Sequence, residues 1–198
     1  MKILALLLTL ITSLPLRAAV ISSIERLDSI IEPSRETTLT HNFTGFGPVW
    51  SDHTFTFRPF LPNYLIGGDL IRPSYYDSDD ADFQLRVTLD APATLFLLID
   101  DRAPNVATTM PWVAAFGFTD TGDDVVVAVS PNSNLTTSSI YSGNFPAGDV
   151  VLLQQNAPGN VGMYLVGAVP EPSSAILLLS GAVFCLRRRP LRTHERNG

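Results

Sequence analysis

The chain has 198 residues and a formal net charge of −6, with 13 Lys+Arg against 19 Asp+Glu. The charge is uneven: residues 19–169 hold six arginines, no lysine and 17 acidic residues, a formal charge of −11, and both ends are basic. Such an acidic body repels nucleic-acid phosphates and anionic headgroups, so neither is expected as a partner. The single cysteine, Cys185, permits no intramolecular disulfide and no cysteine-built zinc site. About 150 residues are enough for one domain with its own core.

Residues 1–18 have the order of a secretory signal peptide. Lys2 supplies the charged start, residues 3–14 the apolar stretch, and Pro15 breaks it before a small-residue site, which predicts cleavage after Ala18. An uncleaved membrane anchor is the alternative, but the apolar run is short for the ~20 residues of a spanning helix. We therefore expect signal peptidase and the general secretion machinery as partners.

The C-terminal segment begins with a proline-rich motif and ends in a basic cluster. The motif is Pro170, Glu171 and Pro172, and the stop-transfer cluster is Arg187, Arg188 and Arg189. The apolar run 173–186 between them would form a helix of about 21 Å, shorter than the ~30 Å bilayer core. Snorkelling arginines and local bilayer thinning can accommodate that mismatch. The positive-inside rule then places residues 19–169 outside the inner membrane.

This arrangement resembles the PEP-CTERM sorting signal of Gram-negative bacteria over residues 169–189. An ordinary tail anchor is the alternative. The resemblance implies that a membrane cysteine protease of the exosortase type recognises the Pro-Glu-Pro motif and removes the helix. It also implies transfer of the protein to the cell envelope or to an extracellular polymer. The chain then divides into a signal peptide (1–18), an exported domain (19–169) and a sorting signal (170–198).

The exported domain opens with a helix signal and continues with strand signals. Ser22 and Glu25 have the spacing of a capping box, which predicts a short helix ended by Pro33. Residues 83–89 alternate apolar and polar side chains, and residues 93–99 are apolar on both faces, as in a strand covered on both sides. Further strands are predicted at 41–43, 54–58, 124–130, 140–145, 150–154 and 162–169.

Eight or so short strands separated by turn residues predict an all-β domain. We expect an antiparallel β-sandwich of jelly-roll-like topology, with a closed barrel as the alternative. Residues 97–102, 110–113, 117–122 and 162–167 resemble stretches of uncharacterised PEP-CTERM proteins and of sandwich modules attached to secreted carbohydrate-active proteins. That second resemblance supports the fold and implies no catalytic residues.

One loop carries a group of alternating carboxylates. They are Asp77, Asp79, Asp80 and Asp82. Calcium takes 6–8 oxygen ligands in flexible geometry, so this loop is a candidate calcium site. The spacing is not that of an EF-hand. The alternative is an ordinary solvated acidic loop.

Asp101 and Arg102 follow the predicted central strand and form a second candidate site. A carboxylate and a guanidinium there could make a bidentate pair that fixes the loop 104–111 and seats Trp112. Alternatively, the pair could bind a sugar hydroxyl. The structural interpretation is favoured because the apolar strand needs a polar end.

Aromatic side chains offer a third candidate, a sugar-stacking platform. They are Trp50, Tyr64, Tyr75, Tyr76 and Trp112. Aromatics in β-domains more often belong to cores or interfaces. As adjacent strand residues, Tyr75 and Tyr76 would point to opposite faces, leaving one exposed as a ligand contact.

Catalysis has little support in the sequence. No nucleophile elbow, phosphate-binding glycine loop or His-Glu-x-x-His motif is present. His41 and His53 are expected to be polar strand residues. A glycosidase needs two carboxylates about 5–10 Å apart. Such a pair could come from Asp100, Asp101, Asp120 and Asp123.

We therefore expect an exported, non-catalytic component of the envelope or extracellular matrix, structural or polysaccharide-binding, that needs no cofactor unless calcium binds. An extracellular polysaccharide-active enzyme and a protein-interaction or adhesion module are the alternatives.

Overall fold

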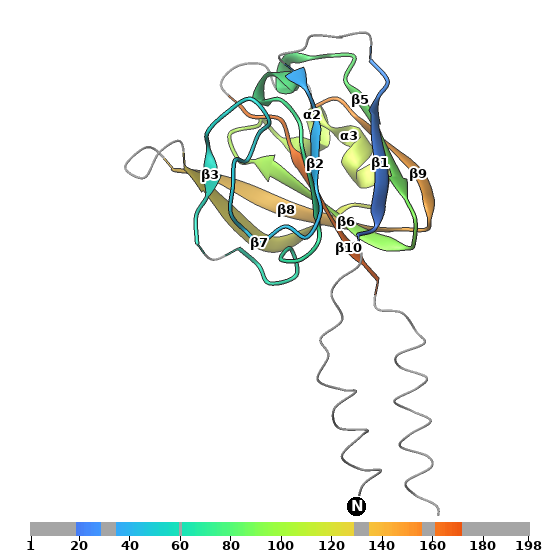
Figure 1. Ribbon diagram of the computed structural model, residues 1–198. Coiled ribbons are helices and arrows are strands. Elements are labelled where there is room, and N and C mark those ends of the chain that lie inside the picture. Colours follow the sequence, from blue (N-terminus) through green and yellow to red (C-terminus); the bar gives the residue numbers. More distant parts are fainter. Residues whose placement is uncertain (1–18, 29–34, 60, 129–134, 156–160, 172–198) are drawn as a thin grey trace, which may run out of the picture.

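The computed structural model describes residues 19–28, 35–59, 61–128, 135–155 and 161–171, which form two antiparallel β-sheets (Figure 1). The smaller sheet has the order β1 (Ile21–Arg26), β5 (Gln84–Leu89) and β9 (Gly148–Leu153). The larger has the order β2 (Thr38–Thr40), β4 (Asp69–Arg72), β10 (Leu165–Pro170), β6 (Ala93–Asp100), β8 (Leu135–Phe145), β7 (Thr119–Ala128) and β3 (Thr56–Phe57). The helical elements are η2 (Tyr75–Asp79), α2 (Val106–Thr109) and α3 (Pro111–Ala115).

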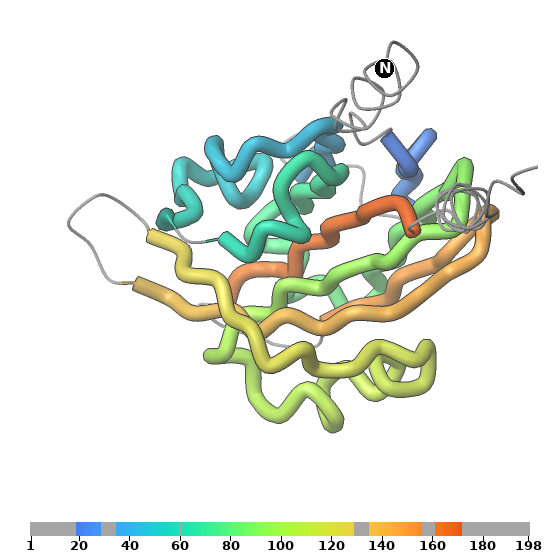
Figure 2. The backbone as a smooth tube through the Cα atoms, turned by 90° about the horizontal axis from the view of Figure 1, so that it is seen from below, coloured from blue at the N-terminus to red at the C-terminus, as the bar shows by residue number. Residues whose placement is uncertain are grey.

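The prediction of a mostly β, antiparallel domain is confirmed. The seven-stranded sheet is curled, and its neighbouring strands β10 (red), β6 (green), β8 (orange) and β7 (yellow) run side by side in Figure 2. Within the described residues it has two edges, β2 and β3, so the closed-barrel alternative is wrong.

The two sheets are linked by a long two-stranded ribbon, in which the β5–β9 pair of one sheet continues as the β6–β8 pair of the other. β5 pairs with β9 up to Leu89 and Gly148, and β6 pairs with β8 from Ala93 and Phe145. The connections between these pairs are short, residues 90–92 on one side and 146–147 on the other. Gly148 has a φ of 126°, a conformation that glycine adopts without strain. The ribbon therefore crosses from one sheet to the other at a tight corner.

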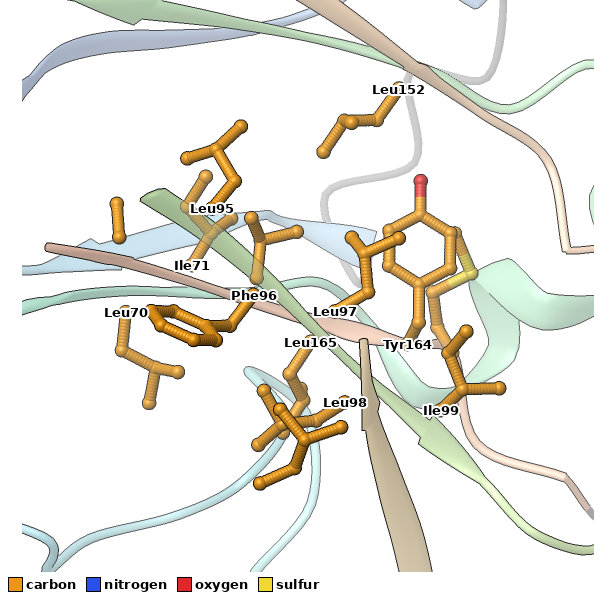
Figure 3. Close-up of a cluster of buried hydrophobic side chains, with 14 of the residues drawn as sticks. Leu70, Ile71, Leu95, Phe96, Leu97, Leu98, Ile99, Leu152, Tyr164 and Leu165 are labelled. Carbon is orange, nitrogen blue, oxygen red and sulfur yellow. The ribbon is translucent and has the colours of Figure 1, made fainter. Parts of the chain in front are cut away.

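The core lies between the sheets and behind β6. In Figure 3, Leu95 and Leu97 of β6 point toward Leu152 of β9, and Phe96 and Leu98 point to the opposite side. All five side chains are buried, so the prediction of a strand covered on both faces is confirmed. The predicted inward face of residues 83–89 is also confirmed, because its four apolar side chains are buried.

The helix predicted at the capping box is wrong. Residues 21–26 form β1, which pairs antiparallel with β5 from Ile21 opposite Leu89 to Arg26 opposite Leu85. A capping box is a local signal of modest energy, and the ladder with β5 outweighs it because it hydrogen-bonds the backbone along the whole segment.

Several predicted strand positions are shifted. The strand expected at 41–43 is β2, which ends at Thr40, because Asn42 has a left-handed φ of 52°. The strand expected at 54–58 contains only two residues. β4 was not predicted, because it has four residues between Gly68 and Pro73. β7 begins at Thr119, five residues before the expected start.

The C-terminal strand reaches into the predicted sorting motif. β10 ends at Pro170, which pairs with Ala93, and the Glu171 amide donates to the Pro92 carbonyl at 3.1 Å. Pro172, the apolar run, the arginine cluster and the expected signal peptide lie outside the described residues. In the part of the chain that the structure describes, no helix is long and apolar enough to span a membrane.

Candidate functional site

The segment that carries Tyr75 and Tyr76 is a short helix, η2, and not a strand as expected. Ser74 caps it: its hydroxyl accepts from the Tyr76 amide at 3.2 Å, and its own amide donates to Asp77 Oδ2 at 3.0 Å. Both halves of a capping box are therefore present here. Tyr75 is half-buried, whereas Tyr76 is 51% exposed.

Arg26 of β1 forms ion pairs with carboxylates in and beside this helix. Arg26 Nη1 lies 2.9 Å from Asp77 Oδ1, and its Nη2 lies 2.9 Å from Asp28 and 3.4 Å from Asp80. Burial raises the pKa of Asp77 to about 6, although Arg26 partly offsets that effect. The Arg26 guanidinium also lies 5.1 Å from the centre of the Phe83 ring.

The ion pairs with Arg26 involve two of the four carboxylates expected to bind calcium, Asp77, Asp79, Asp80 and Asp82. Asp77 and Asp80 turn inward to Arg26, and Asp80 Oδ1 also accepts from the Asp82 amide at 3.0 Å. Among the described residues, no three acidic, histidine or cysteine side chains are grouped so as to hold a metal ion. The calcium expectation gains no support from this arrangement, because two of its four ligands neutralise an arginine.

Asp52 and His53 lie beside η2 and were not predicted as site residues. Asp52 Oδ1 accepts from the Tyr75 amide at 2.8 Å and lies 3.0 Å from His53 Nδ1, and Asp52 Oδ2 accepts from the Ser74 hydroxyl. Burial opposes ionisation of Asp52, but these hydrogen bonds outweigh it and lower the pKa. The His53 ring lies 4.7 Å from the Tyr75 ring and 5.3 Å from the Tyr76 ring.

The predicted Asp101–Arg102 pair is wrong by one residue. Arg102 forms a bidentate ion pair with the buried Asp100, with Nε 3.0 Å from Oδ1 and Nη2 2.5 Å from Oδ2. Asp101 points elsewhere and accepts from the amide and hydroxyl of Ser139 at 2.9 and 2.7 Å. Asp100 is the buried last residue of β6 and Asp101 is an exposed residue of the turn that follows, which gives the two carboxylates different partners. The Arg102 guanidinium lies close enough to Tyr75 to act against the rise in the pKa of that hydroxyl that burial causes, so the structure brings these two predicted residues together.

The remaining predicted aromatics do not form a platform. Trp50 and Trp112 are 2% and 6% exposed, and their indole nitrogens donate to the carbonyls of Met163 and Gln154. Tyr64 stacks on Phe96 with ring centres 4.9 Å apart. The two tryptophans are therefore core residues, the usual place of aromatics in β-domains, and not part of a sugar-stacking platform.

The carboxylates named as a glycosidase pair are each engaged locally. Asp100 holds Arg102 and Asp101 holds Ser139. Asp120 accepts from the Gly122 amide within a bulge of β7, and Asp123 accepts from the Tyr64 hydroxyl. His41, likewise, lies 2.9 Å from the buried Asp69.

The residues that the structure does bring together define one face, here called the tyrosine face. It consists of Asp52, His53, Tyr75, Tyr76 and Arg102. An open pocket of about 500 Å³ adjoins it, lined by residues 47–48 and 51–54 together with Thr56. The face combines exposed aromatic surface with charged hydrogen-bonding groups. The signal that could have found its missed half is the Asp-His pair at 52–53, next to aromatic Trp50 and Phe55.

Comparisons with known proteins identify no family. No protein-family model matches the chain, and no curated protein matches it. Part of a solved structure, described as a GH138 enzyme targeting pectin rhamnogalacturonan II, is similar at 12% identity and a TM-score of 0.47. The similarity covers 78% of this chain but 16% of that enzyme.

Proposed function

We propose that this protein is an exported, non-catalytic component of the envelope or extracellular matrix that binds polysaccharide through the tyrosine face. The observation that carries the proposal is the exposed Tyr76 ring on a helix fixed by hydrogen bonds on both sides. Aromatic rings with one exposed face and polar groups around them suit the alternating apolar and hydroxyl surface of sugars.

The hydrogen bonds that fix η2 favour binding, because a loop that becomes ordered only when the ligand binds costs free energy. Asp52 and Asp77 hold the start of the helix, and the Ser78 hydroxyl donates to the Val161 carbonyl at 2.7 Å. Tyr76 is thus presented by a segment that is already ordered, which reduces the entropy lost when a ligand binds. A purely structural helix would not need to expose its second tyrosine.

The predicted export route is consistent with this role. We infer a jelly-roll-like β-sandwich, delivered by the secretion machinery, retained by its C-terminal helix and processed by an exosortase. Pro170 and Glu171 are the described part of the motif, and both are only partly buried. The body at −11 carries no lysine, which favours solubility outside the cell and repels polyanions.

A glycan array tests the proposal. The full chain, purified in mild detergent, should bind a subset of polysaccharides, and Tyr76→Ala should lose that binding. The matched control is Phe46→Ala, which removes an aromatic that is 84% exposed and lies outside the tyrosine face. Retention by the Tyr76 variant, or binding only to proteins, would instead favour an adhesion module.

An extracellular polysaccharide-active enzyme is the second candidate, favoured by the Asp52–His53 pair. Asp52 orients the ring through Nδ1, which leaves Nε2 of His53 as the nitrogen available to a substrate. This activity would release reducing ends or unsaturated sugars from a polymer, and His53→Ala would abolish the release. Absence of both products across a broad substrate panel would count against it.

A further inference from the structure

Two adjoining pockets open on the side of the domain formed by the end of β6, β8 and the α2–α3 segment. One has a volume of about 200 Å³ and the other about 250 Å³, and they share Asn105, Val106 and Tyr141. None of these residues belongs to the tyrosine face. We call the two together the Tyr141 groove.

The first pocket is polar, and its polar side chains are held in place. Asp101 Oδ1 accepts both hydrogen bonds from Ser139, and Asn105 Oδ1 accepts from the Ala107 amide at 3.2 Å to cap α2. Among the described residues, Asp101 Oδ2 and the Asn105 amide group make no further hydrogen bond. One acceptor and one double donor are therefore fixed at the pocket.

Tyr141 supplies a second donor where the two pockets join. Its hydroxyl makes no hydrogen bond within the described part of the chain, and its ring lines both pockets. Burial, with smaller contributions from Asp120 and Asp101, raises the pKa of Tyr141, so the hydroxyl keeps its proton at neutral pH. The ring and the hydroxyl can thus contact an apolar and a polar part of one ligand.

The second pocket is apolar, and the groove has an acidic rim. Met110, Val113 and Phe118 form the inner wall of the apolar end and are almost wholly buried. Its accessible apolar surface comes from Val106, Ala107 and Ala114. The ionisable groups around the polar end are acidic, except Arg102, which is neutralised by Asp100. An anionic ligand would be repelled, and a ligand without an apolar part would leave the second pocket unfilled.

We propose that the Tyr141 groove binds one neutral sugar residue that carries an apolar group, such as the C6 methyl of a 6-deoxy sugar, an O-methyl group or an acyl group. Asp101 and Asn105 bond its hydroxyls, Tyr141 bonds a further oxygen, and the substituent enters the apolar pocket. This site does not depend on the tyrosine face, so one of the two binding proposals can be wrong while the other holds.

Ligand-observed NMR with the full chain in detergent tests the groove. The probes are methyl glycosides of a neutral hexose, a 6-deoxyhexose and N-acetylglucosamine, with glucuronic acid as the anionic probe. The variants are Tyr141→Phe, Asp101→Asn and Asn105→Asp. Each keeps the packing or capping contact of its residue and removes a free donor or acceptor. Phe46→Ala, at an exposed aromatic that belongs to neither site, is the control.

We expect the 6-deoxy or N-acetyl sugar to bind at millimolar concentration, and the hexose to bind more weakly. Tyr141→Phe should weaken binding about tenfold, the effect of one hydrogen bond, while Phe46→Ala leaves it unchanged. Three results would overturn the proposal: no binding of any neutral glycoside, binding by all three groove variants equal to that of the wild-type protein, or preference for glucuronic acid.

Discussion

Arg26 and Asp77 lie 2.9 Å apart beneath the helix that carries Tyr76, although 51 positions separate them in the sequence. The pair joins the edge strand β1 to η2 and is almost closed to solvent, with the Arg26 side chain 15% exposed and that of Asp77 fully buried. The interior of the domain thus supports the exposed tyrosine face through one ion pair.

Replacing Arg26 should destabilise the domain, because three carboxylates would lose their cation. We expect Arg26→Ala to lower the free energy of unfolding by about 3 kcal/mol, measured by chemical denaturation. Arg86→Ala is the control, since Arg86 pairs with Glu25 and Asp149 at the surface and should change stability by about 1 kcal/mol or less. Equal effects of the two substitutions would contradict a structural role for the buried pair.

The raised pKa of Asp77 predicts a pH dependence. The folded value of about 6 exceeds the model-peptide value of 3.8, so the folded state binds the proton more tightly. The stabilisation from Asp77 should therefore be complete below pH 4 and disappear as the pH rises through 6. Asp77→Asn, which stays neutral, should flatten this part of the stability profile. A profile unchanged by Asp77→Asn would show that other groups control it.

Gly162 packs against the Trp50 indole so closely that a Cβ at this position would overlap the ring. Gly162→Ala should therefore cost about 1–3 kcal/mol of stability. Trp50→Phe should lower the stability by a similar amount, because the hydrogen bond to the Met163 carbonyl is lost. The smaller phenylalanine ring, however, leaves space for a Cβ at position 162. The double variant should be more stable than the two single losses predict, and additive losses would contradict the predicted clash.

The sorting motif gives a prediction in cells. Alanine at Pro170, Glu171 and Pro172 should leave an unprocessed, membrane-retained precursor, visible as a larger species in the membrane fraction. Alanine at Thr193, Glu195 and Asn197, beyond the arginine cluster, is the matched control and should be processed normally. Normal processing of the motif variant would remove the basis for exosortase sorting.

The all-β class of the domain could be predicted because its main strands show a recognisable pattern of apolar and polar residues in the sequence. β5 alternates because one of its faces is buried, and β6 is apolar on both faces because both are buried. These patterns are visible in the sequence without knowing which strands pair. β1 could not be predicted in this way, since its conformation is decided by β5, more than 50 residues away. The short strands β3 and β4 have too few residues to show a period.

The candidate site was predicted only in part, for a similar reason. Tyr75, Tyr76 and Arg102 were singled out by residue type, and the structure places them together. Their neighbours Asp52 and His53 come from a loop more than 20 positions earlier, so only the fold reveals them. The calcium hypothesis for the acidic loop stays a prediction, and nothing local in the sequence shows that Asp77 faces Arg26.

The central claim is that Tyr76 contacts polysaccharide, and a binding isotherm for the array's strongest ligand tests it most directly. The full chain should bind with a measurable dissociation constant, Tyr76→Ala should weaken it about tenfold or more, and Phe46→Ala should leave it unchanged. Equal affinity of the wild-type protein and Tyr76→Ala would contradict the account.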